Sequence, residues 1–231
     1  MKRMCMVAMV CMVGVAAQAA IIDDFSGDLS NWTSTVILDA NGGASNVASW
    51  QIVDGKIELH TTGYDGIEQY AMIYNGLSLG VGEELQVDFA LGSGSQDLGL
   101  YVGGTSPVPL VRQDYIAMYA RNNGQVFTRG FDGTTEYGLV GDWGNVPLDT
   151  LFIARIAENT YEAGYYIGSD RVILATRTPN HPNSGTVVGI YADVRAAGEL
   201  GSLDNFRIIP EPATLALLGL GGLGLLRRRR A

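Results

Sequence analysis

The sequence predicts an all-β fold, a two-sheet antiparallel sandwich, and three observations lead to that prediction. Apolar and polar residues alternate with period two in short runs through the middle of the chain. Gly, Asn and Asp residues separate these runs, as turn residues do between antiparallel strands. No stretch of the body has the apolar spacing of an amphipathic helix. Roughly a dozen strands without helices suffice for two packed sheets.

Seven strands are expected in the first part of the body, each a run rich in β-branched, aromatic or alternating apolar residues. They are Val47–Val53, Lys56–Thr62, Gln69–Asn75, Glu84–Leu91, Asp97–Gly103, Asp114–Arg121 and Gln125–Phe131. Asp54 and Gly55 separate the first two, and an Asp-Gly pair between strands is a strong signal for a two-residue hairpin.

Five more strands are expected in the second part, by the same alternation. They are Leu151–Ala157, Thr160–Ile167, Arg171–Thr176, Thr186–Ala192 and Ser202–Ile209. Glu158-Asn159 and Gly168-Ser169-Asp170 are the tight turns expected between the first three of these.

Composition and the amino terminus indicate an exported protein. Lys2 and Arg3 precede an apolar run, Met4–Val15, and Ala17-Gln18-Ala19 supplies small residues for cleavage after Ala19, so residues 1–19 are predicted to be a signal peptide. Both cysteines lie inside it, which leaves the mature body without disulfides or thiol chemistry. The body keeps nine basic residues against twenty-three acidic ones, a net charge of −14 that argues against nucleic acid and anionic lipid surfaces.

The carboxyl terminus has three parts in a fixed order. Pro210, Glu211 and Pro212 form a stiff joint because proline fixes its own φ and lacks a backbone donor. The run Ala213–Leu226 has no charge, and the cluster Arg227, Arg228, Arg229 and Arg230 follows it. The apolar run is short for a comfortable bilayer span, and the arginines would hold its far end on the cytoplasmic side. An ordinary membrane anchor is the alternative interpretation.

This ending resembles the PEP-CTERM sorting signal of Gram-negative, exopolysaccharide-producing bacteria. The resemblance covers residues 210–231 and implies transient inner-membrane insertion of a short hydrophobic helix. It also implies recognition and processing by an exosortase, a membrane-embedded enzyme similar to cysteine proteases. The protein would then be delivered to the cell envelope, the outer surface or the extracellular matrix.

Short patterns in residues 20–209 resemble concanavalin A-like domains of the LamG or jelly-roll type. They are the opening Asp23-Asp24-Phe25 with Trp32, the hairpin from Trp50 to Leu59, and the closing strand from Leu203 to Ile208. The resemblance implies a jelly-roll fold and no particular chemistry.

A glycanase site is the first chemistry to test in such a sandwich. Related family-16 glycanases carry Glu-x-Asp-x-x-Glu on one strand, and this sequence has no such triplet. The nearest strand places Glu84, Gln86 and Asp88 on one face, opposite Leu85, Val87 and Phe89. The two carboxylates would lie roughly 13 Å apart along the strand, more than the roughly 5–10 Å that glycoside hydrolysis needs. We therefore expect a solvated sheet face and no catalytic residue.

Binding is the better expectation. In Asp114–Arg121 the aliphatic residues alternate with Tyr115, Tyr119 and Arg121, and Tyr101 alternates in the same way with the leucines of its strand. If the aliphatic face is core, these side chains point outward and could form a shallow glycan platform. Trp143, in a polar loop, could close one edge of it. The alternative is that the tyrosines lie between the sheet and covering loops, and that Trp143 plugs one end of the core.

A structural calcium ion is a further hypothesis. Asp23, Asp24 and Asp204 would meet where the first and last strands pair, and oxygen ligands suit calcium. Turn and edge-strand carboxylates without a metal are the alternative. No other cofactor is expected.

Taken together, the sequence predicts an exported, non-enzymatic protein of the cell envelope or matrix that binds exopolysaccharide weakly. The alternative is a carbohydrate-active hydrolase or lyase with a site that the sequence does not reveal.

Overall fold

The computed structural model describes residues 19–41, 48–61, 66–92, 97–121, 123–180, 185–195 and 197–210. These residues form fifteen β-strands. They are β1 (Ala20–Asp23), β2 (Trp32–Asp39), β3 (Ala48–Val53), β4 (Lys56–Thr61), β5 (Glu68–Tyr74), β6 (Glu83–Leu91), β7 (Asp97–Gly103), β8 (Tyr115–Arg121), β9 (Val126–Asp132), β10 (Thr135–Asp142), β11 (Thr150–Ala157), β12 (Thr160–Ile167), β13 (Asp170–Arg177), β14 (Val187–Val194) and β15 (Gly198–Pro210).

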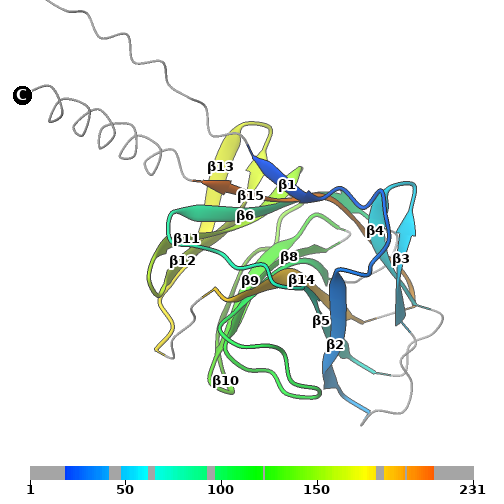
Figure 1. Ribbon diagram of the computed structural model, residues 1–231, viewed down its shortest axis with the longest axis horizontal. Coiled ribbons are helices and arrows are strands. Elements are labelled where there is room, and N and C mark those ends of the chain that lie inside the picture. Colours follow the sequence, from blue (N-terminus) through cyan, green and yellow to red (C-terminus); the bar gives the residue numbers. More distant parts are fainter. Residues whose placement is uncertain are drawn as a thin grey trace, which may run out of the picture.

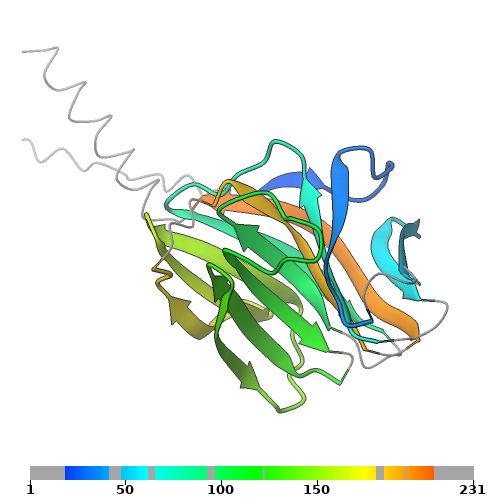
Figure 2. The ribbon, with the colours of Figure 1, turned by 90° about the horizontal axis from the view of Figure 1, so that it is seen from below.

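The strands form two antiparallel sheets (Figure 1). Sheet A has the order β13-β12-β11-β6-β15-β4-β3, with β1 paired to the end of β15. Sheet B has the order β10-β9-β8-β7-β14-β5-β2. Figure 2 shows β15, in orange, as the long strand that runs from one end of the domain to the other. The expected all-β sandwich of two antiparallel sheets is confirmed.

The main core lies between the sheets, because alternate residues of each strand point inward. Sheet B contributes Leu98, Leu100, Val102, Ile116, Met118, Ala120, Val188, Ile190 and Ala192. Sheet A contributes Ile57, Leu59, Leu85, Val87, Phe89, Leu151, Ile153 and Leu203. The apolar faces expected for β6, β7 and β8 are therefore the ones that are buried.

Polar side chains close the two open sides of the sandwich. On one side, Trp50 of β3 donates its indole N–H to Ser34 Oγ of β2 at 3.0 Å. On the other side, Arg177 of β13 reaches β9 and β10, donating to Thr128 O and Gly138 O at 2.7 Å each. These contacts connect the edge strands of sheet A to the edge strands of sheet B.

All twelve expected strands are present, with bounds shifted by one to four residues at some ends, and three strands were not expected. β1 has only four residues, too few to show an alternation. In β2, Thr33, Ser34 and Thr35 hide the apolar periodicity. β10 contains Gly138 and Gly141, and its residues are mostly exposed, so packing imposes no alternation on it. The predicted signal peptide and the hydrophobic helix of the tail lie outside the described residues.

Candidate functional site

The outer face of sheet B, which points away from sheet A, carries a second cluster of buried apolar side chains. The odd-numbered residues of β7, β8 and β14 point to this face, since the even-numbered ones fill the main core. Its members are Ile37, Ala71, Tyr101, Tyr115, Ala117, Tyr119, Phe127, Phe131, Val187 and Tyr191. The rings of Tyr101 and Tyr115 pack across the neighbouring strands β7 and β8, with centroids 4.9 Å apart. The rings of Tyr119 on β8 and Tyr191 on β14 meet over Gly99 of β7, with centroids 5.2 Å apart.

The exposed platform considered for Tyr101, Tyr115 and Tyr119 is not observed, and the alternative in which these side chains are covered is the correct one. The three side chains point away from the main core as expected, but their exposed fractions are 1%, 1% and 0%. The loop between β7 and β8 accounts for part of this burial. Its Leu110 donates a backbone hydrogen bond to Val36 O of β2 at 2.9 Å. Because β14 and β5 lie between β7 and β2, the loop crosses the outer face to make this bond.

Trp143 is the exposed aromatic residue of this region, with 62% of its surface accessible. Its ring packs edge-on against Phe127, with centroids 4.7 Å apart. The guanidinium of Arg121 lies 4.4 Å from the centroid of Phe127 and 5.9 Å from that of Trp143. Trp143 therefore lies at the rim of the outer face, beside Arg121, and does not plug the main core.

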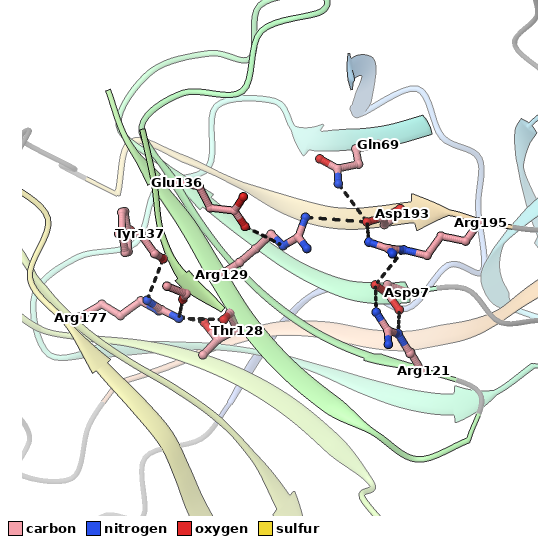
Figure 3. Close-up of polar contacts among 11 residues, drawn as sticks. Gln69, Asp97, Arg121, Thr128, Arg129, Glu136, Tyr137, Arg177, Asp193 and Arg195 are labelled. Atoms are coloured by element: carbon pink, nitrogen blue, oxygen red, sulfur yellow. Dashed lines mark hydrogen bonds and ion pairs between the residues drawn. The ribbon is translucent and has the colours of Figure 1, made fainter. Parts of the chain in front are cut away.

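Buried charges occupy the same end of the outer face (Figure 3). Asp97 and Asp193 are cross-strand partners on β7 and β14, and both have no exposed surface. Arg121 donates to both oxygens of Asp97, at 2.5 and 3.2 Å. Arg195 and Gln69 donate to Asp193 Oδ2, at 2.8 and 2.9 Å. The charges of the two carboxylates are thus compensated by Arg121 and Arg195, and buried carboxylates require such partners.

Arg129 of β9 lies beside this group, and its ionic partners within the described part of the chain are both distant. Its Nη1 lies 3.8 Å from Asp193 Oδ2, and its Nε lies 3.6 Å from Glu136 Oε1. Its guanidinium carbon is 5.7 Å from the centre of the Tyr119 ring. A nearly buried guanidinium with five N–H donors is poorly satisfied by two contacts of this length.

Several polar atoms on this face have no hydrogen-bond partner among the described protein atoms. They are the hydroxyls of Tyr115, Tyr119 and Tyr191, Gln69 Oε1, Asp193 Oδ1, and the Nε atoms of Arg129 and Arg195. An unmet buried polar group costs about 1–3 kcal/mol, so seven of them among the described residues of one face are a large concentration for a domain of this size. The set contains donors and acceptors together, which is what a polyhydroxylated ligand requires.

Burial raises the pKa of Asp97 to about 6, although Arg121 acts in the opposite direction. Because the folded state then holds its proton more tightly than the unfolded state, Asp97 favours folding at low pH. That contribution is lost as the pH rises from about 4 to about 6, and it amounts to about 3 kcal/mol. Urea unfolding at pH 4 and pH 7 should show this loss in the wild type. Asp97→Asn should show a smaller loss, and equal losses in the two proteins would contradict the assignment.

The outer face of sheet A is a closed polar network, and here the expectation of a solvated face is wrong. Glu84 and Gln86 are each only 6% exposed. Glu84 accepts hydrogen bonds from Gln86, Tyr166 and Arg171, at 2.6 to 2.9 Å. Asp88 accepts from Thr150 Oγ1 at 2.8 Å, and from Asn205 and Arg207. These carboxylates are occupied in holding strands together.

The carboxylates proposed as calcium ligands do not converge. Asp23 accepts from Phe25 N at one oxygen and from Trp32 Nε1 at the other, both at 2.8 Å. Asp24 accepts from Ser26 N, and Asp204 from Asn205 N. No group of three or more His, Cys, Asp or Glu side chains that could hold a metal occurs among the described residues. Asp24 stabilises the turn after β1, whereas Asp23 and Asp204 lie within β1 and β15, so the described residues do not gather the three aspartates into a metal site.

Of the sorting residues, only Pro210 lies in the described part of the chain. It is the last residue of β15 and the register partner of Glu83, the first residue of β6. Glu211, Pro212, Arg227, Arg228, Arg229 and Arg230 lie outside the described residues. Among the residues that are described, no helix is long and apolar enough to cross a membrane.

Comparison with solved structures defines the class of the sandwich. The lumenal domain of VIP36 in a Ca²⁺- and Man2-bound form matches with a TM-score of 0.55 and 12% identity, covering 82% of this chain and 86% of that one. The E269S variant of LamA from Zobellia galactanivorans, in complex with laminaritriose and laminaritetraose, matches with a TM-score of 0.54 and 9% identity, covering 83% of this chain and 98% of that one. A protein of Bacillus subtilis with a galectin-like fold matches with a TM-score of 0.52 and 8% identity, covering 81% and 94%. The body is a galectin-like, concanavalin A-like jelly roll.

Sequence comparison adds one assignment. Residues 209–230 match the PEP-CTERM protein-sorting motif. The motif marks the chain for export and for membrane-associated sorting to the cell envelope by an exosortase. Among curated proteins the comparison finds no match.

Proposed function

We propose that this protein is an exported, non-enzymatic component of the cell envelope or of its polysaccharide matrix, and that the outer face of sheet B binds exopolysaccharide weakly. The signal peptide and the tail, which inserts transiently into the inner membrane, direct it there. The observation that carries the binding proposal is the set of buried polar atoms that have no hydrogen-bond partner among the described residues. Some structural neighbours were solved with saccharides, which supports the same class of ligand.

The ligand reaches the tyrosines only when the loop between β7 and β8 moves. Leu110 in this loop has φ = 60°, a left-handed conformation that costs a non-glycine residue about 1–2 kcal/mol. Its hydrogen bond to Val36 and the packing of Arg112 over Phe131, 4.7 Å from the ring centre, hold the loop down. Opening therefore releases backbone strain, which reduces its net cost. Trp143 and Arg121 at the rim give the glycan its first contacts.

Binding is tested by affinity electrophoresis and titration calorimetry with exopolysaccharide fragments and a panel of neutral and acidic polysaccharides. The proposal expects weak binding to at least one polysaccharide. Trp143→Ala should weaken it, whereas Trp50→Phe, on the far side of the sandwich, should not. If no polysaccharide of the panel binds, the binding proposal is wrong and the protein has a purely structural role in the matrix.

A second candidate function is glycoside hydrolysis, and one observation favours it. Asp97 and Asp193 are directly opposed on neighbouring strands, which places their Cα atoms about 4.5–5.5 Å apart. Both side chains point to the outer face of sheet B, and a pKa near 6 suits a general acid. However, both carboxylates are fully buried and paired with arginines. Reducing-end release that Asp97→Asn abolishes would establish the enzyme in place of the binding protein.

The tail makes its own prediction. Glu211→Ala, or deletion of Arg227–Arg230, should leave most of the protein unprocessed and away from its final location. The reason is that these changes remove the charge at the centre of the motif or the cytoplasmic anchor of its apolar run. Intact-mass spectrometry of surface material reads out the result. If wild-type surface protein still carries the arginine cluster, the tail acts as a simple anchor.

Calcium has no part in this proposal. Since Asp23, Asp24 and Asp204 already accept hydrogen bonds within the protein, the melting temperature should be the same with calcium and with a chelator. A clear rise with calcium would show a site that the described residues do not assemble.

A further inference from the structure

Both ends of the sandwich's chain lie at one end of sheet A. Ala20, the first residue of β1, is the register partner of Ile208 in β15. Pro210, which ends β15, pairs with Glu83, which begins β6. Arg155, near the end of β11, pairs with the same Glu83. We call this end of β1, β15, β6 and β11 the exit pole; Figure 1 shows β1 beside the end of β15.

The sorting motif begins at the exit pole without a spacer. Its match starts at residue 209, within β15. The apolar run of the tail starts at Ala213, three residues after Pro210. Three residues of fully extended chain span at most about 10 Å. The exit pole is therefore never farther than that from the start of the apolar run.

This short reach places the pole at the membrane whenever the tail is inserted. The hydrocarbon core of a bilayer is about 30 Å thick, and the full bilayer is about 40–45 Å thick. Each headgroup layer is therefore about 5–7 Å thick. A body tethered within about 10 Å of the hydrocarbon boundary must rest in or directly on that layer. The folded sandwich has no freedom to stand away from the lipid.

The surface of the exit pole has the chemistry that such contact requires. Three of its residues are exposed large aliphatic side chains: Ile21 on β1, Val81 in the turn before β6 and Ile156 on β11, with exposed fractions of 58%, 52% and 37%. The carboxylate of Glu83 is turned back on Gly80 N at 2.6 Å, so it does not extend toward the lipid. The guanidinium of Arg155 is directed to the carbonyl oxygens of Leu79 and Glu158.

We propose that the exit pole is a lipid-contacting surface, and that the tail-bearing protein sits on the bilayer with Val81, Ile156 and Ile21 in the headgroup layer. This inference rests on the proposed insertion of the tail. It goes beyond that proposal by fixing the orientation of the sandwich. Because lipid covers the exit pole, a saccharide must approach the outer face of sheet B from the side or from the solvent above. The processing enzyme must likewise approach the tail from the side of the sandwich.

The test uses the full chain with Cys5→Ser and Cys11→Ser, so that one introduced thiol carries a fluorescent label. Val81→Cys and Ile156→Cys report on the exit pole. Leu91→Cys is the matched control, because Leu91 ends the same strand, β6, and is 51% exposed. Eight residues of strand separate Glu83 from Leu91, which is roughly 27 Å. The vesicles are phosphatidylcholine with a headgroup nitroxide, which avoids repulsion of the acidic body by anionic lipid.

We expect the protein to float with the vesicles, and the nitroxide to quench labels at 81 and 156 at least about twice as strongly as the label at 91, given the roughly 27 Å between the two ends of the strand. Flotation with equal quenching at all three positions would overturn the pole contact and leave tail insertion standing. A protein that does not float would overturn tail insertion, and the pole contact with it.

Discussion

Arg177→Met should lower the free energy of unfolding by about 3 kcal/mol, the largest stability effect that we expect from a single side chain that connects the two sheets. The Arg177 side chain is 8% exposed and donates to four oxygens on β9 and β10. Two of these bonds are 2.7 Å long, and a hydrogen bond from a charged donor contributes about 1.5–3 kcal/mol. The cost of keeping the guanidinium out of water, which also lowers its pKa, offsets part of the sum.

Chemical denaturation measures this prediction, and Arg112→Met is its control. Arg112 is half-buried and packs over Phe131, so the same substitution there should cost less than about 1 kcal/mol. An equal, small effect at both positions would show that Arg177 does not hold the two sheets together at the β13 side. If Arg177→Met loses stability but binds saccharide as the wild type does, then the Arg177 contact is structural and is not part of the candidate site.

The double variant Tyr119→Phe and Tyr191→Phe should bind exopolysaccharide about thirtyfold more weakly, since each lost hydrogen bond removes about 1 kcal/mol. The same variant should be as stable as the wild type or more stable by about 1–2 kcal/mol. Both hydroxyls are buried and have no partner among the described protein atoms, so removing them ends an unmet desolvation cost. The rings, which pack on each other at 5.2 Å, stay in place.

These opposite signs distinguish a binding role from a structural one. Tyr166→Phe on sheet A is the matched control, because its hydroxyl donates to Glu84 at 2.7 Å and its loss should destabilise the fold without affecting binding. If the double variant loses stability and keeps its affinity, the hydroxyls are structural. Calorimetry for affinity and urea unfolding for stability give the two readouts.

The strands and the inward faces could be predicted from sequence because burial imposes period two on them. Leu98, Leu100 and Val102 alternate with Gly99 and Tyr101, and the structure buries the expected set. The direction of the tyrosines followed from the same alternation. Their exposure did not, because it depends on a loop that bonds to β2, a strand whose Thr-rich sequence shows no periodicity.

The charged part of the candidate site shows a similar limit. Asp97 and Arg129 lie within expected strands, and their parity places them on the face of the tyrosines. Asp193 follows the expected end of its strand at Ala192, so sequence reasoning missed the acid pair. Which charges meet depends on the order β8-β7-β14-β5, and a single sequence does not determine that order. Gln69 and Arg195 were missed for the same reason.

The most direct test of the central claim is a map of where the glycan binds. Backbone amide shifts of the isotopically labelled protein are followed by nuclear magnetic resonance during titration with oligosaccharides of the exopolysaccharide. We expect shifts concentrated in β7, β8, β9 and β14, in the loop between β7 and β8, and at the Trp143 indole. Shifts confined to sheet A, or none with any saccharide that is offered, would contradict it.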